Sequence, residues 1–132
     1  MIVRGEQLTA LGSARETQFT SEMVTHLRSH FPREVDGLGD GELRIHIEES
    51  LTRARGYGLT STQDTIRFLN LCASFGWHFD QEPSRPWVGE YLHDAEIALP
   101  SERLSRVSRR CLRDLKTESN NRKARAALGG AA

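Results

Sequence analysis

Residues 61–76, with the sequence STQDTIRFLNLCASFG, decide the fold of this chain. Ser61, with Asp64 three residues later, is typical of a helix N-terminus, because the serine side chain accepts a hydrogen bond from a backbone N–H of the first turn. Apolar residues then occupy most sides of the helix, and Gly76 ends it. A helix that is apolar on most sides packs against several neighbours. We therefore expect residues 61–75 to form the central helix of the core.

Two amphipathic helices are expected before it. Leu8 and Leu11 indicate a further short helix before Gly12-Ser13. Residues 13–31 then form the first amphipathic helix, which Pro32 stops. Residues 32–41 form a turn-rich connector, and the second helix follows it, with Asp40 as its N-cap and with Gly56 and Gly58 closing it. Apolar residues recur every three or four positions in both helices, at Phe19, Met23, Val24, Leu27 and Phe31 and at Leu43, Ile47, Leu51 and Ala54.

Two further helices are expected after the central one. A short helix starts at Pro86 and ends near Asp94, and the last helix starts at Ser101. The last helix has an apolar inner face and an arginine-rich outer face; the inner residues are Leu104, Val107, Cys111, Leu112 and Leu115. The pattern predicts an all-α, single-domain bundle of about five helices over residues 1–118, followed by a flexible polar and Ala/Gly tail over residues 119–132.

The composition fits a globular protein on the polar side. The chain has 132 residues, of which 37% are hydrophobic and 27% charged. It has no apolar run of about 18 residues, so no membrane span is expected. The N-terminus turns polar at once, which argues against a secretory signal. Cys72 and Cys111 lie in apolar helical patterns, so we expect buried, reduced thiols.

The charge is distributed unevenly, although the total is zero. Residues 1–100 have a net charge of −6 and residues 101–132 a net charge of +6. Three interpretations of the arginine-rich last helix remain open: a solvated helix face, which we place first, docking onto an acidic protein surface, and contact with nucleic acid. Its candidate contact residues are Arg106, Arg109, Arg110 and Arg113.

The connector at residues 75–87, FGWHFDQEPSRPW, contains four of the nine aromatic residues and two of the four prolines. One interpretation is structural: Trp77, Phe79 and Trp87 fold back over the central helix. The other is a partner-binding surface, since tryptophan, tyrosine and arginine dominate interface hot spots. The candidate partner-binding residues are Trp77, Pro83, Trp87 and Tyr91.

No motif points to catalysis, a cofactor or a metal. His26 and His30 have the spacing of metal ligands, but no further ligand completes a zinc site, so we interpret them as surface histidines. The glycine-rich residues 37–41 follow no strand and contain an acidic residue where an anion would bind, which favours a turn. Adjacent Glu48 and Glu49 diverge on a helix and cannot act as a catalytic pair. We expect a protein that is not an enzyme.

A resemblance gives this reading a context. Phe31-Pro32, residues 53–59 (RARGYGL) and the spaced aromatic and proline residues of the connector resemble small helical proteins encoded in bacterial type VI secretion effector clusters. It covers about residues 5–95 and includes no catalytic motif. The resemblance implies a cytoplasmic accessory, acting as a chaperone or co-chaperone in effector loading by binding an effector or its chaperone. The alternatives are an immunity protein that neutralises a toxin and a nucleic-acid-binding regulator that uses the basic last helix.

Overall fold

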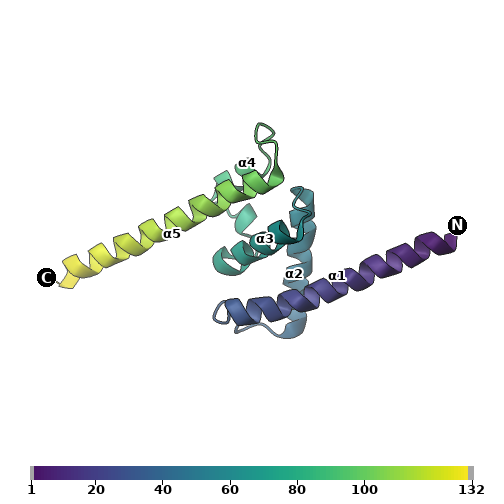
Figure 1. Ribbon diagram of the computed structural model, residues 1–132. Coiled ribbons are helices and arrows are strands. Elements are labelled where there is room, and N and C mark those ends of the chain that lie inside the picture. Colours follow the sequence, from purple (N-terminus) through teal and green to yellow (C-terminus); the bar gives the residue numbers. More distant parts are fainter. Residues whose placement is uncertain (1, 131–132) are drawn as a thin grey trace. The chain divides into compact units, whose positions relative to one another are not determined.

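The computed structural model describes the backbone of residues 2–130 and the side chains of residues 15–128. All regular secondary structure in the described residues is helical, with no strand, which confirms the predicted all-α fold of about five helices. The elements, labelled in Figure 1, are α1 (Ile2–His30), α2 (Asp40–Gly56), α3 (Thr62–Phe75), the 3₁₀-helix η1 (Phe79–Gln81), α4 (Pro86–Leu92) and α5 (Pro100–Gly130).

The helices pack into two compact units, residues 1–79 and residues 80–132. The first contains α1, α2 and α3, which pack against one another, and the second contains α4 packed against α5. The sequence placed residues 1–118 in one helical domain; the boundary between the two units falls inside the aromatic connector. Each unit is described by itself below.

The core of the first unit forms where α1, α2 and α3 meet. Its buried side chains come from the apolar stripes predicted on each helix and from the connector between α1 and α2: Met23, Leu27, Val35, Leu43, Ile47, Leu51, Leu69 and Ala73. On α3 the buried apolar residues are Phe68, Leu69, Leu71, Cys72 and Ala73. Their spread around the helix confirms the prediction that α3 is apolar on most sides. The predicted cap is also present, since the Ser61 hydroxyl accepts a hydrogen bond from the backbone N–H of Asp64 at 3.1 Å.

The start of the chain differs from the prediction. The sequence suggested a short helix that ends before Gly12-Ser13, whereas α1 is one continuous helix of 29 residues. A glycine inside a helix costs only about 1 kcal/mol relative to alanine, so it weakens a helix without having to end it. Leu8 and Leu11, on which the short helix was predicted, have side chains outside the described residues.

Asp40 was predicted to be the N-cap of α2, and this prediction is wrong. Gly39 is the N-cap and makes no side-chain capping bond. The Asp40 carboxylate instead accepts hydrogen bonds from Arg28 of α1, at 2.7 and 3.0 Å. Arg28 also donates to the carbonyl of Leu38, at 2.8 Å. The Asp40 carboxylate therefore binds Arg28 of α1 and does not cap the N-terminus of α2.

The end of α2 leads directly into α3. α2 ends at Gly56, as expected, and Gly58 has a φ of 81°, a left-handed conformation that favours glycine. This turn brings the N–H of Leu59 within 2.9 Å of the Ala54 carbonyl and buries the Leu59 side chain. The Tyr57 ring lies 6.0 Å from the Phe68 ring. Gly58 thus allows a short reversal between two core helices.

The last residues of the first unit are fixed to α2 and α3. The Arg53 guanidinium of α2 donates a hydrogen bond to the backbone carbonyl of Trp77. The Trp77 ring stacks on His46 at 4.8 Å between centroids, with the two planes 7° apart. Phe79 is buried, and its ring lies 5.5 Å from Phe68. The structural interpretation of the connector therefore holds for Trp77 and Phe79.

In the second unit, α4 and α5 bury a small apolar set: Val88, Leu92, Ile97, Leu104, Val107 and Cys111. Two predictions about α5 are wrong. Leu112 and Leu115 were expected on its buried face but are 57% and 47% exposed. Residues 119–130, expected to be a flexible tail, continue the helix.

Candidate functional site

The eight partner-binding residues predicted from the sequence divide between the two units. Trp77 belongs to the first unit, and the others belong to the second. Pro83 is exposed in the connector, Trp87 and Tyr91 lie on α4, and Arg106, Arg109, Arg110 and Arg113 lie on α5. The structure therefore brings most of two predicted patches, one aromatic and one basic, into the same small unit.

The aromatic and basic patches meet on one surface. Trp87 and Tyr91 are one helical turn apart on α4, and their partly exposed rings meet edge to face with centroids 6.3 Å apart. The Cζ atom of Arg110 on α5 lies 4.3 Å from the Trp87 ring centroid. This distance is that of a cation–π contact, in which the face of the ring attracts the guanidinium. The surface formed by Trp87, Tyr91, Arg106, Arg109, Arg110 and Arg113 is called the α4–α5 surface below.

The arginines surround a depression in the α4–α5 surface. Their spacing of three, four and seven residues places them on adjoining turns of one helix face. The depression has a volume of about 590 Å³ and is lined by Tyr91, the four arginines and two carboxylates, Glu102 and Asp114. With four arginines against two carboxylates, its lining carries a net positive charge.

Only part of this positive charge is paired. The Glu102 carboxylate accepts from Arg106 at 3.4 Å and from Arg109 at 3.0 Å. All three side chains are about half exposed or more, so these pairs position the arginines but contribute little stability. Among the described residues, Arg110 and Arg113 have no carboxylate partner. They are the groups available to an incoming anion.

A smaller depression of about 200 Å³ adjoins the first, since Tyr91 and Arg110 line both. Its other lining residues are Trp87, Glu90 and Asp94. The two carboxylates give the aromatic end of the surface a negative edge. Carboxylates therefore lie in both depressions, Glu102 and Asp114 among the arginines and Glu90 and Asp94 beside the aromatic residues.

Sequence reasoning missed an apolar part of this region. Leu112 and Leu115 lie on α5 beyond Cys111, the last buried apolar residue described on this helix. α4 has only seven residues, so within the second unit both leucines stay largely uncovered. The signal was available in the sequence: the expected helix at residues 86–94 was too short to cover a stripe that extends to residue 115.

The other candidate groups have structural partners. The His26 and His30 rings lie 4.6 Å apart, but His26 Nε2 is 2.8 Å from Asn70 Oδ1, which ties α1 to α3. Within the described residues, no group of three or more histidine, cysteine or acidic side chains gathers in a way that would hold a metal ion. Both cysteines are buried, and neither forms a disulfide bond within the described residues. Burial raises the pKa of the Cys111 thiol, an effect that the positive charge of Arg85 partly offsets.

None of the described helices has a stretch apolar and long enough to cross a lipid bilayer. Comparisons with protein-family models, with curated proteins and with solved structures found no match to this chain.

Proposed function

We propose that this protein is a cytoplasmic accessory that binds another protein and carries out no chemistry itself. The α4–α5 surface makes the contact, and the preferred partner segment is acidic with an apolar residue beside its carboxylates. One observation carries this proposal: the Arg110 guanidinium lies over the Trp87 ring, Arg113 lies one helical turn further along α5, and neither guanidinium has a carboxylate partner within the described residues. Exposed tryptophan, tyrosine and arginine are the residue types that contribute most to protein interfaces.

Binding would proceed in two physical stages. The net positive arginine face attracts an acidic segment during encounter, which mainly raises the association rate. Carboxylates of the partner then pair with Arg110 and Arg113, whose planar guanidinium groups can bind a carboxylate through two parallel hydrogen bonds. An apolar partner side chain covers the exposed parts of Trp87 and Tyr91 and excludes water from these pairs. Such desolvation strengthens the charge interactions.

The distribution of charge favours a protein partner over a nucleic acid. Glu102 and Asp114 lie among the arginines, and Glu90 and Asp94 lie at the aromatic end of the surface. A nucleic acid presents a continuous line of phosphates, which these four carboxylates would repel. A peptide can instead match this distribution, with carboxylates opposite the arginines and basic or neutral groups opposite the acidic edge.

The biological setting rests on the sequence resemblance described above. We propose that the partner is an effector, or an effector chaperone, of a type VI secretion system, and that the protein acts as a chaperone or co-chaperone before secretion. Several residues of the resembling string have roles in the first unit: Arg53 binds the Trp77 carbonyl, Gly58 makes the turn after α2, and Phe79 is buried. Those residues support the fold, whereas the proposed contact lies mainly in α4 and α5.

The test is co-purification of the tagged chain with each protein encoded beside its gene. We expect one stable complex, weakened at least tenfold by the double variant Arg110→Glu/Arg113→Glu. The matched control is Arg122→Glu/Arg125→Glu, which makes the same charge change farther along the exposed face of α5 and should bind normally. No complex with any neighbour, or equal loss in both variants, would refute the proposal. Rescue of toxin-expressing cells by this chain alone would identify an immunity protein instead.

A further inference from the structure

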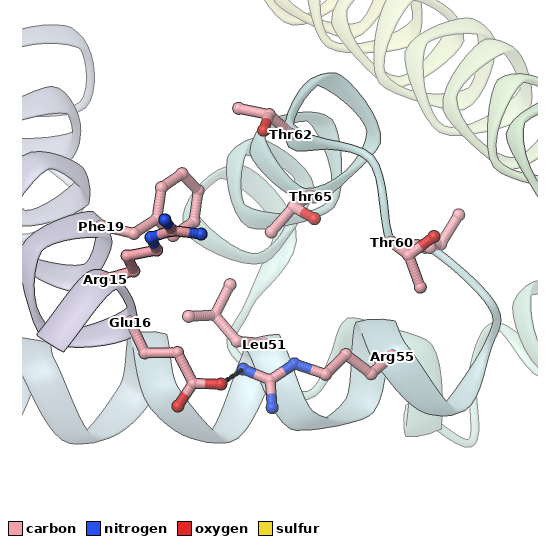
Figure 2. Close-up of a pocket in the computed structure, with 9 residues that line it drawn as sticks. Arg15, Glu16, Phe19, Leu51, Arg55, Thr60, Thr62 and Thr65 are labelled. Carbon is pink, nitrogen blue, oxygen red and sulfur yellow. Dashed lines mark ion pairs between the residues drawn. The ribbon is translucent and has the colours of Figure 1, made fainter. Parts of the chain in front are cut away.

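A second concave site lies in the first unit and is separate from the α4–α5 surface. It is a pocket of about 410 Å³ between α1, α2 and the segment that leads into α3. Figure 2 shows Arg15 and Phe19 on one side of it and Thr60 on the opposite side, with Leu51 and Thr65 between them. A volume of this order is at the lower end of the range for small-ligand sites, about 300–1,000 Å³.

The pocket has an apolar floor. Phe19, Leu51 and Leu59 supply it, one from each of three chain segments. Leu51 and Leu59 are buried and therefore fixed by the core, and Phe19 packs partly against the same core. The floor is thus preformed and apolar, and an apolar side chain that fills it is stabilised by leaving water.

The rim carries one uncompensated positive charge. Glu16 and Arg55 form an ion pair at 3.1 Å, drawn as a dashed line in Figure 2. Arg15 has no ion-pair or hydrogen-bond partner among the described residues, so the charge it adds to the rim is unbalanced. Arg15 together with the neutral Glu16–Arg55 pair gives the rim one net positive charge, which a group with a single negative charge balances and a doubly charged phosphate exceeds.

Hydroxyl groups complete the rim. Thr65 is engaged, since its hydroxyl donates to the Ser61 carbonyl at 2.7 Å. The hydroxyls of Thr60 and Thr62 make no hydrogen bond within the described part of the chain, and each can donate or accept one. They can therefore pair with the N–H and C=O groups of a peptide. This favours a peptide over a simple alkanoic acid, which has a carboxylate and an apolar chain but no peptide groups.

From these three features we propose that the pocket binds the C-terminus of another polypeptide whose last residue is apolar. The final side chain lies on Phe19, Leu51 and Leu59, and the terminal carboxylate pairs with Arg15. The Thr60 and Thr62 hydroxyls bind the last peptide groups. Capture of the C-terminal carboxylate of a chain is an established mode of peptide recognition. This inference does not depend on the proposed role of the α4–α5 surface.

The experiment is a titration of the ¹⁵N-labelled full-length protein, followed by its amide NMR signals. The probes are acetyl-Gly-Ser-Leu with a free C-terminal carboxylate, the same peptide as its C-terminal amide, and hexanoate. We expect the free acid to shift the signals of residues 59–65 and to bind about tenfold more tightly than the amide. This difference corresponds to one charge-assisted hydrogen bond, which the amide cannot make. Hexanoate, which lacks peptide groups, should bind more weakly than the free-acid peptide.

Two variants make the test specific. Arg15→Gln should weaken binding of the free-acid peptide about tenfold and leave the affinity for the amide unchanged. Arg33→Gln makes the same chemical change at an exposed position of the same unit and should bind like the unmodified protein. Both positions are exposed, so neither change should affect folding. Equal affinity for acid and amide, hexanoate binding as tightly as the peptide, or no shift at residues 59–65 would overturn the inference.

Discussion

Arg53 and Arg55 are two residues apart on α2 and provide a matched pair of perturbations. The Arg53 guanidinium binds the Trp77 carbonyl and lies within 3.5 Å of the Ser50 hydroxyl and 4.0 Å of the Cys72 sulfur. Arg55 instead forms a surface ion pair with Glu16. Replacing either arginine by methionine keeps an unbranched side chain of good helix propensity and removes the guanidinium. The two changes therefore differ mainly in the contacts that they break.

The expected effects follow from these contacts. A hydrogen bond from a charged donor contributes about 1.5–3 kcal/mol, and the partly buried Arg53 makes one to a backbone carbonyl that would lose its partner. Arg53→Met should therefore lower the free energy of unfolding by about 2 kcal/mol. The Arg55 and Glu16 side chains are 53% and 61% exposed, and exposed ion pairs contribute about 0–1 kcal/mol. Arg55→Met should cost less than about 0.5 kcal/mol.

The assay is urea unfolding in a Trp87→Phe background, which leaves Trp77 as the single tryptophan and so reports on the first unit. With a slope of about 2 kcal/mol per molar urea, the Arg53 variant should shift the midpoint down by about 1 M. The Arg55 variant should shift it by less than about 0.25 M on the same slope. Equal shifts in the two variants, or a larger shift for Arg55, would show that Arg53 does not hold the connector to α2.

Three further outcomes are expected from single changes. Leu43→Ala should lower the free energy of unfolding of the first unit by about 2–5 kcal/mol, measured by chemical denaturation, because the Leu43 side chain is fully buried. Ile45→Ala, at an exposed position of the same helix, should cost less than about 0.5 kcal/mol. Similar losses in the two variants would mean that the structure places the wrong face of α2 in the core. Ser61→Ala should cost about 1 kcal/mol through loss of the cap of α3, and no change in the unfolding midpoint would mean that the cap is not formed in solution. Burial raises the pKa of the Cys111 thiol, so the folded state favours the neutral thiol; this contribution to stability is retained below the thiol pKa of the unfolded chain and is lost as the pH rises through the higher pKa of the folded state. Iodoacetamide at pH 8 should therefore label Cys72 and Cys111 rapidly only after unfolding. Rapid labelling of the native protein would contradict their burial.

The core of the first unit could be predicted because its helices have simple patterns. Residues such as Leu27 on α1 and Ile47 on α2 recur at helical spacing, and each is fully buried. The cap at Ser61 is local, since donor and acceptor are three residues apart. Interactions of this kind depend on neighbouring residues in the sequence and are therefore visible in it.

The errors came from interactions between distant residues. Asp40 looked like a cap until Arg28, twelve residues earlier, was placed beside it. Leu112 and Leu115 looked buried because the length of the helix opposite them was not taken into account. Arg110 and Trp87 were predicted as parts of separate patches, and only the packing of α4 on α5 brings them within 4.3 Å. The individual candidate residues could be predicted, but their combination into one surface could not.

The most direct test of the central claim is amide hydrogen–deuterium exchange of the chain, alone and in complex with its co-purified partner. If the protein works by presenting the α4–α5 surface to an acidic segment, complex formation should slow exchange most strongly in residues 86–92 and 102–115. That protection should disappear in Arg110→Glu/Arg113→Glu and persist in Arg122→Glu/Arg125→Glu. Protection confined to residues 15–79, with α4 and α5 unchanged, would contradict the account.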